Sequence, residues 1–262
     1  MRTTPFKFFV FHRELEMSCR LLQAGVSAIL IDLEHRGKAQ RQDGFDTEIN
    51  VHSVDDLRRL RDETDKTIMC RISGPDASDS ELSSVIENGA DEIIIPMVRR
   101  PAEVERIIKR TDGHCRITVM IETVDGASQA GSLSDLSIDN IYVGLNDLHI
   151  QRGTRSIFAP LADGLLEKIR RRCANVGFGF GGLTLPNLGT PVPSMHLYAE
   201  MARLDCSFTF LRRSFYRDVS GRDLGEELAN MKAAIQAMQA RPPLVIAEDF
   251  LAMKKLISQG RV

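Results

Sequence analysis

The amino-acid sequence predicts an α/β protein built as one (β/α)₈ barrel, or TIM barrel, with an additional C-terminal helix. Strand-length apolar runs rich in β-branched residues alternate with helix-length stretches along the chain. Eight such strands can be counted, which is the number that closes this barrel. No Pro-, Gly- or Ser-rich linker divides the 262 residues. We therefore expect a single domain over 1–262, with the barrel at about 5–240 and a helical extension at about 244–258.

Each expected element has a local signal at its ends. Gly25 is suited to end the first helix, Ser53 is an N-cap candidate, and Pro101 is tolerated in a first helical turn. The expected strands are 6–11, 26–33, 67–72, 92–98, 117–121, 141–145, 177–185 and 206–211. The expected helices are 14–23, 53–63, 79–88, 101–109, 125–136, 161–175, 194–204 and 224–240. Arg241-Pro242-Pro243 breaks the chain before a last amphipathic helix at 245–257.

Composition limits the kind of partner. The formal net charge is −2 with 27% charged residues of mixed sign, so no basic face for nucleic acid is expected. The five cysteines show no CxxC spacing, which favours reduced thiols in a cytoplasmic protein. The N-terminal apolar stretch is too short for a signal peptide and no later stretch is long enough to span a membrane, so we expect neither secretion nor membrane insertion. Small molecules and further copies of the chain remain as expected partners.

Two acidic residues follow neighbouring strands of the predicted barrel. Glu122 follows the strand at 117–121, and Asp147 follows the strand at 141–145. Because the two strands are expected to be parallel, both carboxylates should converge at one rim. Two carboxylates with open positions beside them suit a hard divalent cation whose shell is completed by water or substrate oxygens. The sequence therefore predicts a metal site.

Other polar side chains are expected at the same rim, because barrel chemistry lies at the C-terminal ends of the strands. They are His12, Glu34, His35, Arg71, Arg212 and Arg213. We keep the last two out of the catalytic set, since exposed arginines often serve only solubility. His52 is expected to cap a helix or to lie on the surface.

Five motifs, in order and spacing, resemble the HpcH/HpaI aldolase family of the 4-hydroxy-2-oxoheptanedioate aldolase type. This family belongs to the phosphoenolpyruvate/pyruvate superfamily, with the citrate lyase beta subunit. The resemblance covers about residues 26–153. The motifs are IDLEH at 31–35, CRIS at 70–73, GADEIIIPMV at 89–98, MIET at 120–123 and GLNDLHIQRG at 144–153.

The resemblance implies a metal-dependent class II pyruvate aldolase. Glu122 and Asp147 would hold Mg²⁺, Mn²⁺ or Co²⁺, Arg71 would face the enolate oxygen, and His35 would take or give the proton. Asp32 or Glu34 could orient the ring of His35. The backbone amides from Gly144 to Asn146 could hold the substrate carboxylate. The family resemblance also implies a dimer-based homo-oligomer, possibly a hexamer.

Two other interpretations stay open. DLEH followed by Lys38 and Arg41 also resembles citrate lyase beta-like enzymes, which act on coenzyme A thioesters such as malyl-CoA or citramalyl-CoA. A non-catalytic barrel that binds a keto acid is the alternative of another class. The charged stretch 36–50 and the Gly-rich stretch 179–195 match neither enzyme group, and the glycines there could form an anion nest or a tight bend.

Overall fold

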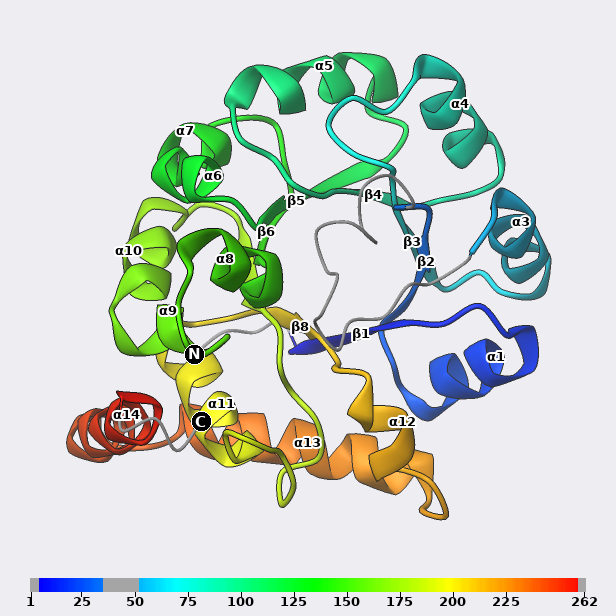
Figure 1. Cartoon of the computed structure of the whole chain (residues 1–262). Coiled ribbons are helices and arrows are strands. Elements are labelled where there is room, and N and C mark those ends of the chain that lie inside the picture. The colour runs from blue at the N-terminus through cyan, green and yellow to red at the C-terminus, as the bar shows by residue number, and fades with distance from the viewer. Residues whose placement is uncertain (1–4, 35–51, 259–262) are drawn as a thin grey trace.

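The computed structural model describes residues 5–34 and 52–258, and it shows a closed barrel of eight strands (Figure 1). Every neighbouring pair of strands is parallel, and β8 closes on β1. The predicted (β/α)₈ barrel is confirmed. The strands are β1 (Lys7–Phe11), β2 (Ala28–Asp32), β3 (Thr67–Arg71), β4 (Glu92–Ile95), β5 (Arg116–Ile121), β6 (Asn140–Val143), β7 (Gly177–Phe180) and β8 (Phe208–Phe210).

Helices form a ring outside the strands (Figure 1). Those before β6 are α1 (Leu15–Ala24), α3 (Val54–Glu63), α4 (Asp79–Glu87), α5 (Pro101–Thr111), α6 (Val124–Ser128) and α7 (Ala130–Ser134). Those after β6 are α8 (Leu145–Arg152), α9 (Ala159–Ala162), α10 (Leu165–Arg172), α11 (Ser194–Arg203), α12 (Ser214–Asp218), α13 (Leu224–Gln239) and α14 (Pro243–Ser258). Ser53 forms the expected cap of α3, accepting a hydrogen bond from the Asp56 amide.

Four helical segments differ from the sequence prediction. The helix expected at 125–136 is two short helices, α6 and α7, and the one expected at 161–175 is α9 and α10. Gly164, with φ of 81°, lies between α9 and α10, so the chain turns there in a conformation that favours glycine. Helices α8 and α12 were not predicted. None of the described helices is both long and apolar enough to cross a membrane.

Two apolar layers hold the barrel. The larger layer fills the space between strands and helices, whereas a smaller cluster lies inside the barrel. Because side chains alternate along a strand, the residue two positions beyond an interior one points inward again. Phe9, Leu30, Met69 and Met120 belong to the interior cluster. The next inward positions, at the C-terminal ends of the same strands, are Phe11, Asp32, Arg71 and Glu122, so the interior becomes polar at that rim.

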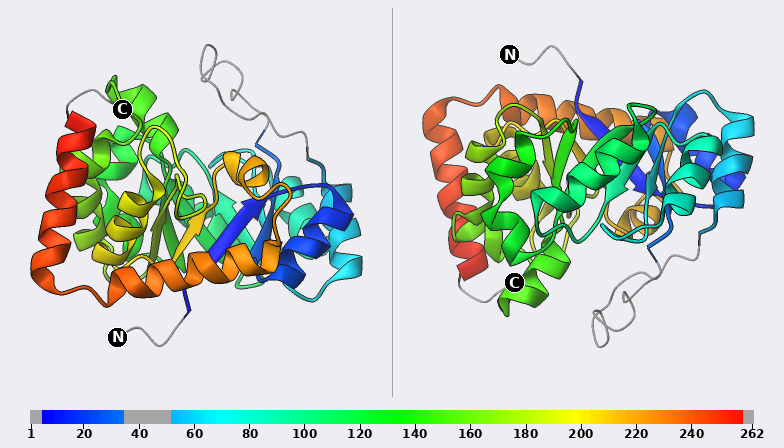
Figure 2. Two further views of the ribbon diagram at one scale, coloured as in Figure 1. Left: turned by 90° about the horizontal axis from the view of Figure 1, so that it is seen from below. Right: turned by 90° about the horizontal axis from the view of Figure 1, so that it is seen from above.

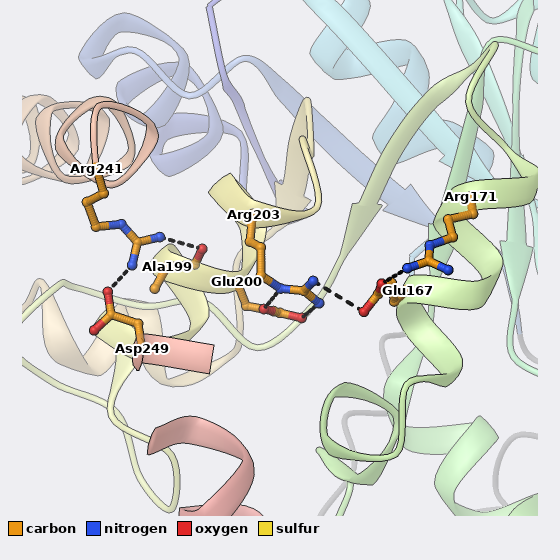
Figure 3. Close-up of polar contacts among 7 residues, drawn as sticks. All are labelled: Glu167, Arg171, Ala199, Glu200, Arg203, Arg241 and Asp249. Atoms are coloured by element: carbon orange, nitrogen blue, oxygen red, sulfur yellow. Dashed lines mark hydrogen bonds and ion pairs between the residues drawn. The ribbon is translucent and has the colours of Figure 1, made fainter. Parts of the chain in front are cut away.

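The extension α14 packs against its own barrel, alongside α9 and α11 (Figure 2). Figure 3 shows the polar contacts at this junction. Arg241 donates to the Ala199 carbonyl at 2.9 Å and pairs with Asp249 on α14. Arg203 on α11 pairs with Glu200 and lies 4.2 Å from the centre of the Phe250 ring. The expected additional helix is therefore confirmed, and Arg241 before α14 and Arg203 on α11 contact residues of α14 that hold it in place.

Candidate functional site at the C-terminal rim

A buried ion pair holds Arg71 at the end of β3. Its Nε and Nη2 atoms donate to the two oxygens of Asp32 at 2.9 and 2.8 Å. Its Nη1 atom lies 3.3 Å from Glu34 Oε2, and the guanidinium lies 4.7 Å from the centre of the Phe11 ring. Burial alone would lower the pKa of Arg71, but the carboxylates of Asp32 and Glu34 raise it. The result is a positive charge fixed at the rim.

Glu122 follows β5 and is only 4% exposed. Burial, followed by the negative charges of Asp147 and Glu34, raises the pKa of Glu122 to about 8. The Met97 amide donates to Glu122 Oε2 at 3.1 Å. Met97 has φ of 55°, a left-handed conformation that is costly for a residue with a side chain, so the backbone bears strain where it holds this carboxylate. No sequence pattern indicates this role of Met97.

The backbone of Gly144 leaves room for Glu122. A Cβ atom at residue 144 would lie 2.5 Å from both Glu122 Cγ and Oε1, so only glycine fits beside that side chain. The Gly144 amide donates to the Ile121 carbonyl at 3.0 Å, as a continuation of the β5–β6 pairing. This hydrogen bond occupies the amide, and the role of Gly144 seen in the structure is steric. Substrate binding at Gly144 stays a prediction.

Asp147 lies in the first turn of α8, and it is 8% exposed. We expected it at a strand end, but β6 stops at Val143 and the helix begins at Leu145. The first amides of a helix have no acceptor within the helix, and its N-terminus favours negative charge. Leu145 and Asn146 precede Asp147 in this turn, so their amides are among those at the N-terminus of α8. Their binding of a substrate carboxylate stays a prediction.

The acid pair fits a hard divalent cation. Glu122 and Asp147 repel each other in a buried setting, and a cation between them would compensate both charges. Within residues 5–34 and 52–258 no three His, Cys, Asp or Glu side chains converge as a complete ligand set. Two protein carboxylates with several open positions are typical of Mg²⁺ sites, where water and substrate oxygens complete the shell. The donor set therefore matches the metals expected from the sequence.

Comparison with known proteins adds the fold family. No family model matches the sequence. A curated ATP-dependent 6-phosphofructokinase from Streptococcus uberis is 30% identical over 126 residues, covering 42% of this chain and 35% of that protein. The chain thus spans about a third of the length of this relative, and the match carries no statement on activity.

Solved structures match over nearly the whole chain. An HpcH/HpaI aldolase from Desulfitobacterium hafniense has a TM-score of 0.60 at 13% identity, covering 92% of this chain and 95% of that one. An HpcH/HpaI aldolase/citrate lyase family protein from Burkholderia cenocepacia gives 0.62 at 12%, covering 90% and 95%. Macrophomate synthase gives 0.61 at 14%, covering 89% and 86%. The chain shares the barrel fold of these proteins.

The structure brings together Asp32, Glu34, Arg71, Glu122 and Asp147. The charge of Arg71 interacts with those of Asp32, Glu34 and Glu122. The charge of Glu122 interacts in turn with those of Asp147 and Glu34. His35, the expected proton-transfer residue, lies outside the described residues, as does the stretch 36–50. His12 ends β1 as expected, and its ring lies 5.0 Å from that of Tyr216. No described residue makes a hydrogen bond to the buried His12 Nε2 atom.

His52 is a site residue that the sequence prediction missed. It was expected on the surface or as a cap, but it is 5% exposed. Its Nδ1 atom accepts a hydrogen bond from the Asp32 amide at 3.0 Å, so this nitrogen carries no proton. Burial lowers the pKa of His52 to about 4. His52 therefore supports the backbone of the residue that anchors Arg71, and its position next to the cap residue Ser53 hid this role in the sequence.

Replacing His52 by glutamine should change how stability depends on pH. In the native protein the pKa of His52 is about 4, below its ordinary value of 6.5, so the unfolded chain binds the proton more readily. Its contribution is present above pH 6.5 and is lost as the pH falls towards 4. Between pH 8 and pH 5 we expect the wild type to lose about 2 kcal/mol of unfolding free energy more than His52→Gln does. Urea unfolding at both pH values measures this, with His114→Gln on the surface as control. Parallel losses in wild type and His52→Gln would contradict it.

The N-terminal end of the barrel holds a cavity with mixed charges. A cavity of about 340 Å³ opens there, lined by Lys7, Glu92, Arg116 and Lys232 among others. Glu92 is 2% exposed, and its carboxylate accepts hydrogen bonds from Thr118 and Asn140. A single carboxylate that already has its donors offers no acid pair for a divalent cation. The C-terminal rim therefore remains the candidate active site.

Proposed function

We propose that the protein is a divalent-metal-dependent carbon–carbon lyase of the pyruvate aldolase type. It would form or cleave the bond between a pyruvate-like enolate and an aldehyde. The observation that carries the proposal is the buried acid pair Glu122 and Asp147 at the same rim as the fixed guanidinium of Arg71. The barrel fold that the chain shares with HpcH/HpaI aldolases supports it.

Each group has a chemical task in this reaction. A Mg²⁺, Mn²⁺ or Co²⁺ ion held by Glu122 and Asp147 would supply Lewis acidity toward the keto acid. Asp32 and Glu34 hold three nitrogens of Arg71, which leaves two of its five N–H groups for a substrate oxygen. A donor preorganised in this way contributes about 3 to 4 kcal/mol to oxyanion stabilisation in well-studied enzymes.

The substrate carboxylate and the proton need further groups. The amides of Leu145 and Asn146, at the start of α8, are positioned to bind a carboxylate. We assign proton transfer to His35, on the strength of its position in the DLEH motif. This role stays a prediction, because His35 lies outside the described residues.

Proton exchange tests the proposal without knowledge of the aldehyde. Metal-stripped protein is incubated with pyruvate in deuterated water, Mg²⁺, Mn²⁺ or Co²⁺ is restored in turn, and loss of the methyl-proton signal is followed by NMR. Exchange that requires a metal and His35 is the expected result, with His35→Ala compared against His114→Ala. Wild-type protein that exchanges no methyl protons with any of the three metals would overturn the proposal.

A second candidate keeps the barrel but uses a coenzyme A thioester. It is favoured by the structural similarity to an aldolase/citrate lyase family protein. Lys38 and Arg41, the basic residues expected to contact the nucleotide, lie outside the described residues. Cleavage of malyl-CoA, followed by release of the thioester product, distinguishes it from the aldolase. A non-catalytic keto-acid-binding barrel would bind metal and pyruvate and show no exchange.

The expected partners stay part of the proposal. They are a keto acid, an aldehyde and further copies of the chain in a homo-oligomer. Leu244 and Leu251 on α14 are exposed apolar side chains in the single chain. A cytoplasmic location also stays a prediction.

A further inference from the structure

Tyr142 is the one interior aromatic side chain of the barrel that carries a hydroxyl group. It lies on β6, belongs to the interior cluster and is 6% exposed. Its ring stacks on that of Phe210 at 3.8 Å between centroids and 14° between planes. A second ring, Phe208, lies 6.2 Å away. These contacts fix the direction of the side chain, so the position of its hydroxyl is determined by packing.

The hydroxyl of Tyr142 reaches the rim beside β7. Phe178 and Phe180 of β7 point to the outer layer, so Gly179 and Gly181 occupy the inward positions. A Cβ atom at Gly181 would overlap the Tyr142 hydroxyl oxygen. Gly181 is the first residue beyond the end of β7, where the active-site rim begins. The absence of a side chain there therefore gives the hydroxyl its place at the level of the rim.

The electrostatic surroundings of Tyr142 are those of the acid pair and the arginine. Burial raises the pKa of its hydroxyl, the charge of Glu122 raises it further, and Arg71 lowers it. The hydroxyl thus stays protonated at neutral pH and lies within the electrostatic field of both groups. A neutral hydroxyl in that position is a hydrogen-bond donor toward an oxyanion.

Among the described residues this hydroxyl has no hydrogen-bond partner, whereas the other two tyrosines have one. Tyr198 donates to the Thr184 carbonyl at 2.9 Å, and Tyr216 donates to the Phe11 carbonyl at 2.7 Å. The Tyr142 oxygen is not one of the fully buried polar atoms that lack a partner, so it is open to the space at the rim. Phenylalanine would fill the same space and stack equally well, so packing does not account for the hydroxyl. A hydroxyl that is open to the rim can donate to a ligand bound there.

We propose that the Tyr142 hydroxyl donates a hydrogen bond to an oxygen of the keto acid bound at the rim, which makes Tyr142 a further catalytic residue. This inference rests on the proposed function. It assigns the oxyanion two protein donors from different strands, Arg71 on β3 and Tyr142 on β6. No proton is transferred, because the hydroxyl only donates the hydrogen bond and keeps its proton.

Tyr142→Phe removes the oxygen and keeps the stacked ring, and Tyr198→Phe is the matched control, since it removes a buried hydroxyl bonded elsewhere. We expect Tyr142→Phe to lower the rate of metal-dependent pyruvate proton exchange about 10- to 100-fold, with a melting temperature close to that of the wild type. Tyr198→Phe should keep the exchange rate and melt at a lower temperature. A purely structural hydroxyl at Tyr142 would not produce this opposition of rate and stability.

A binding readout is available because the chain has three tyrosines and no tryptophan. Protein labelled with 3-fluorotyrosine gives three ¹⁹F resonances, and Tyr142→Phe identifies one of them. Adding oxalate, a planar dianion resembling the pyruvate enolate, with Mg²⁺ should shift the Tyr142 resonance most. If the wild type exchanges protons, the Tyr142→Phe variant exchanges them equally fast, and oxalate does not move the Tyr142 resonance, this inference alone is overturned. Wild-type protein without any exchange would overturn the proposed function and this inference with it.

Discussion

Glu122→Ala is expected to abolish metal-dependent exchange of the pyruvate methyl protons, with a loss on the order of a thousandfold or more. The variant removes one of the two carboxylates proposed to hold the cation, and Asp147 alone leaves too few protein ligands. NMR in deuterated water measures the rate, and calorimetric titration with Mn²⁺ measures the affinity. The wild type should also gain about 2.7 kcal/mol of unfolding free energy at a metal concentration 100 times Kd. Glu122→Ala should gain none.

Glu92→Gln is the matched control for this prediction. Glu92 is another buried glutamate near a strand end, 2% exposed against 4% for Glu122, but it lies at the opposite end of the barrel. We expect this variant to keep both the exchange rate and the stabilisation by metal. Exchange that survives in Glu122→Ala would contradict the metal site. If both variants lost exchange equally, the loss in Glu122→Ala would reflect damage to the fold and not removal of a metal ligand.

Arg71→Met is expected to lower the free energy of unfolding by about 3 to 5 kcal/mol and to remove the exchange activity. The variant removes the guanidinium that pairs with Asp32 and Glu34, and breaking a buried ion pair by removing one partner costs that much. Asp32 is fully buried and bonds Arg71 through both oxygens, so little solvent is available to replace the guanidinium. Urea unfolding at pH 7.5 measures the loss.

The double variant Asp32→Asn/Arg71→Met separates stability from chemistry. It removes both partners of the ion pair, so we expect its stability to lie well above that of Arg71→Met alone. Its exchange activity should stay absent, because the Arg71 guanidinium is missing from the rim. Recovered activity in the double variant would show that Arg71 only neutralises Asp32. Equal stability of the single and double variants would mean that the pair is not coupled.

The barrel was predictable because its strands carry a strong local signal. Strands buried on both faces read as continuous apolar, β-branched runs, as in residues 93–95 and 117–121. Helix α8 was missed because the apolar run of β6 passes into it through Gly144, with no side-chain cap between them. The steric role of Gly144 was missed for a related reason, since the side chain it accommodates belongs to another strand.

The partners of the site residues were harder to predict than their location. The alternation of strands and helices places Asp32 and Arg71 at one rim, yet nothing local indicates that they bond each other over 39 positions of sequence. Met97 and His52 support the site through a backbone amide and a ring nitrogen, respectively. Neither contact leaves a motif, because each depends on which strand lies next to which.

By itself, the sequence determined the barrel, its extra helix and the rim at which the acids and Arg71 gather. Apolar periodicity and the direction of parallel strands are local properties, and they are sufficient for that result. Only the tertiary structure decided which groups contact one another. Closure of the barrel places Gly144 against Glu122 and Gly181 against the Tyr142 hydroxyl. Such contacts join residues from neighbouring strands, and their geometry is fixed only when all eight strands have closed.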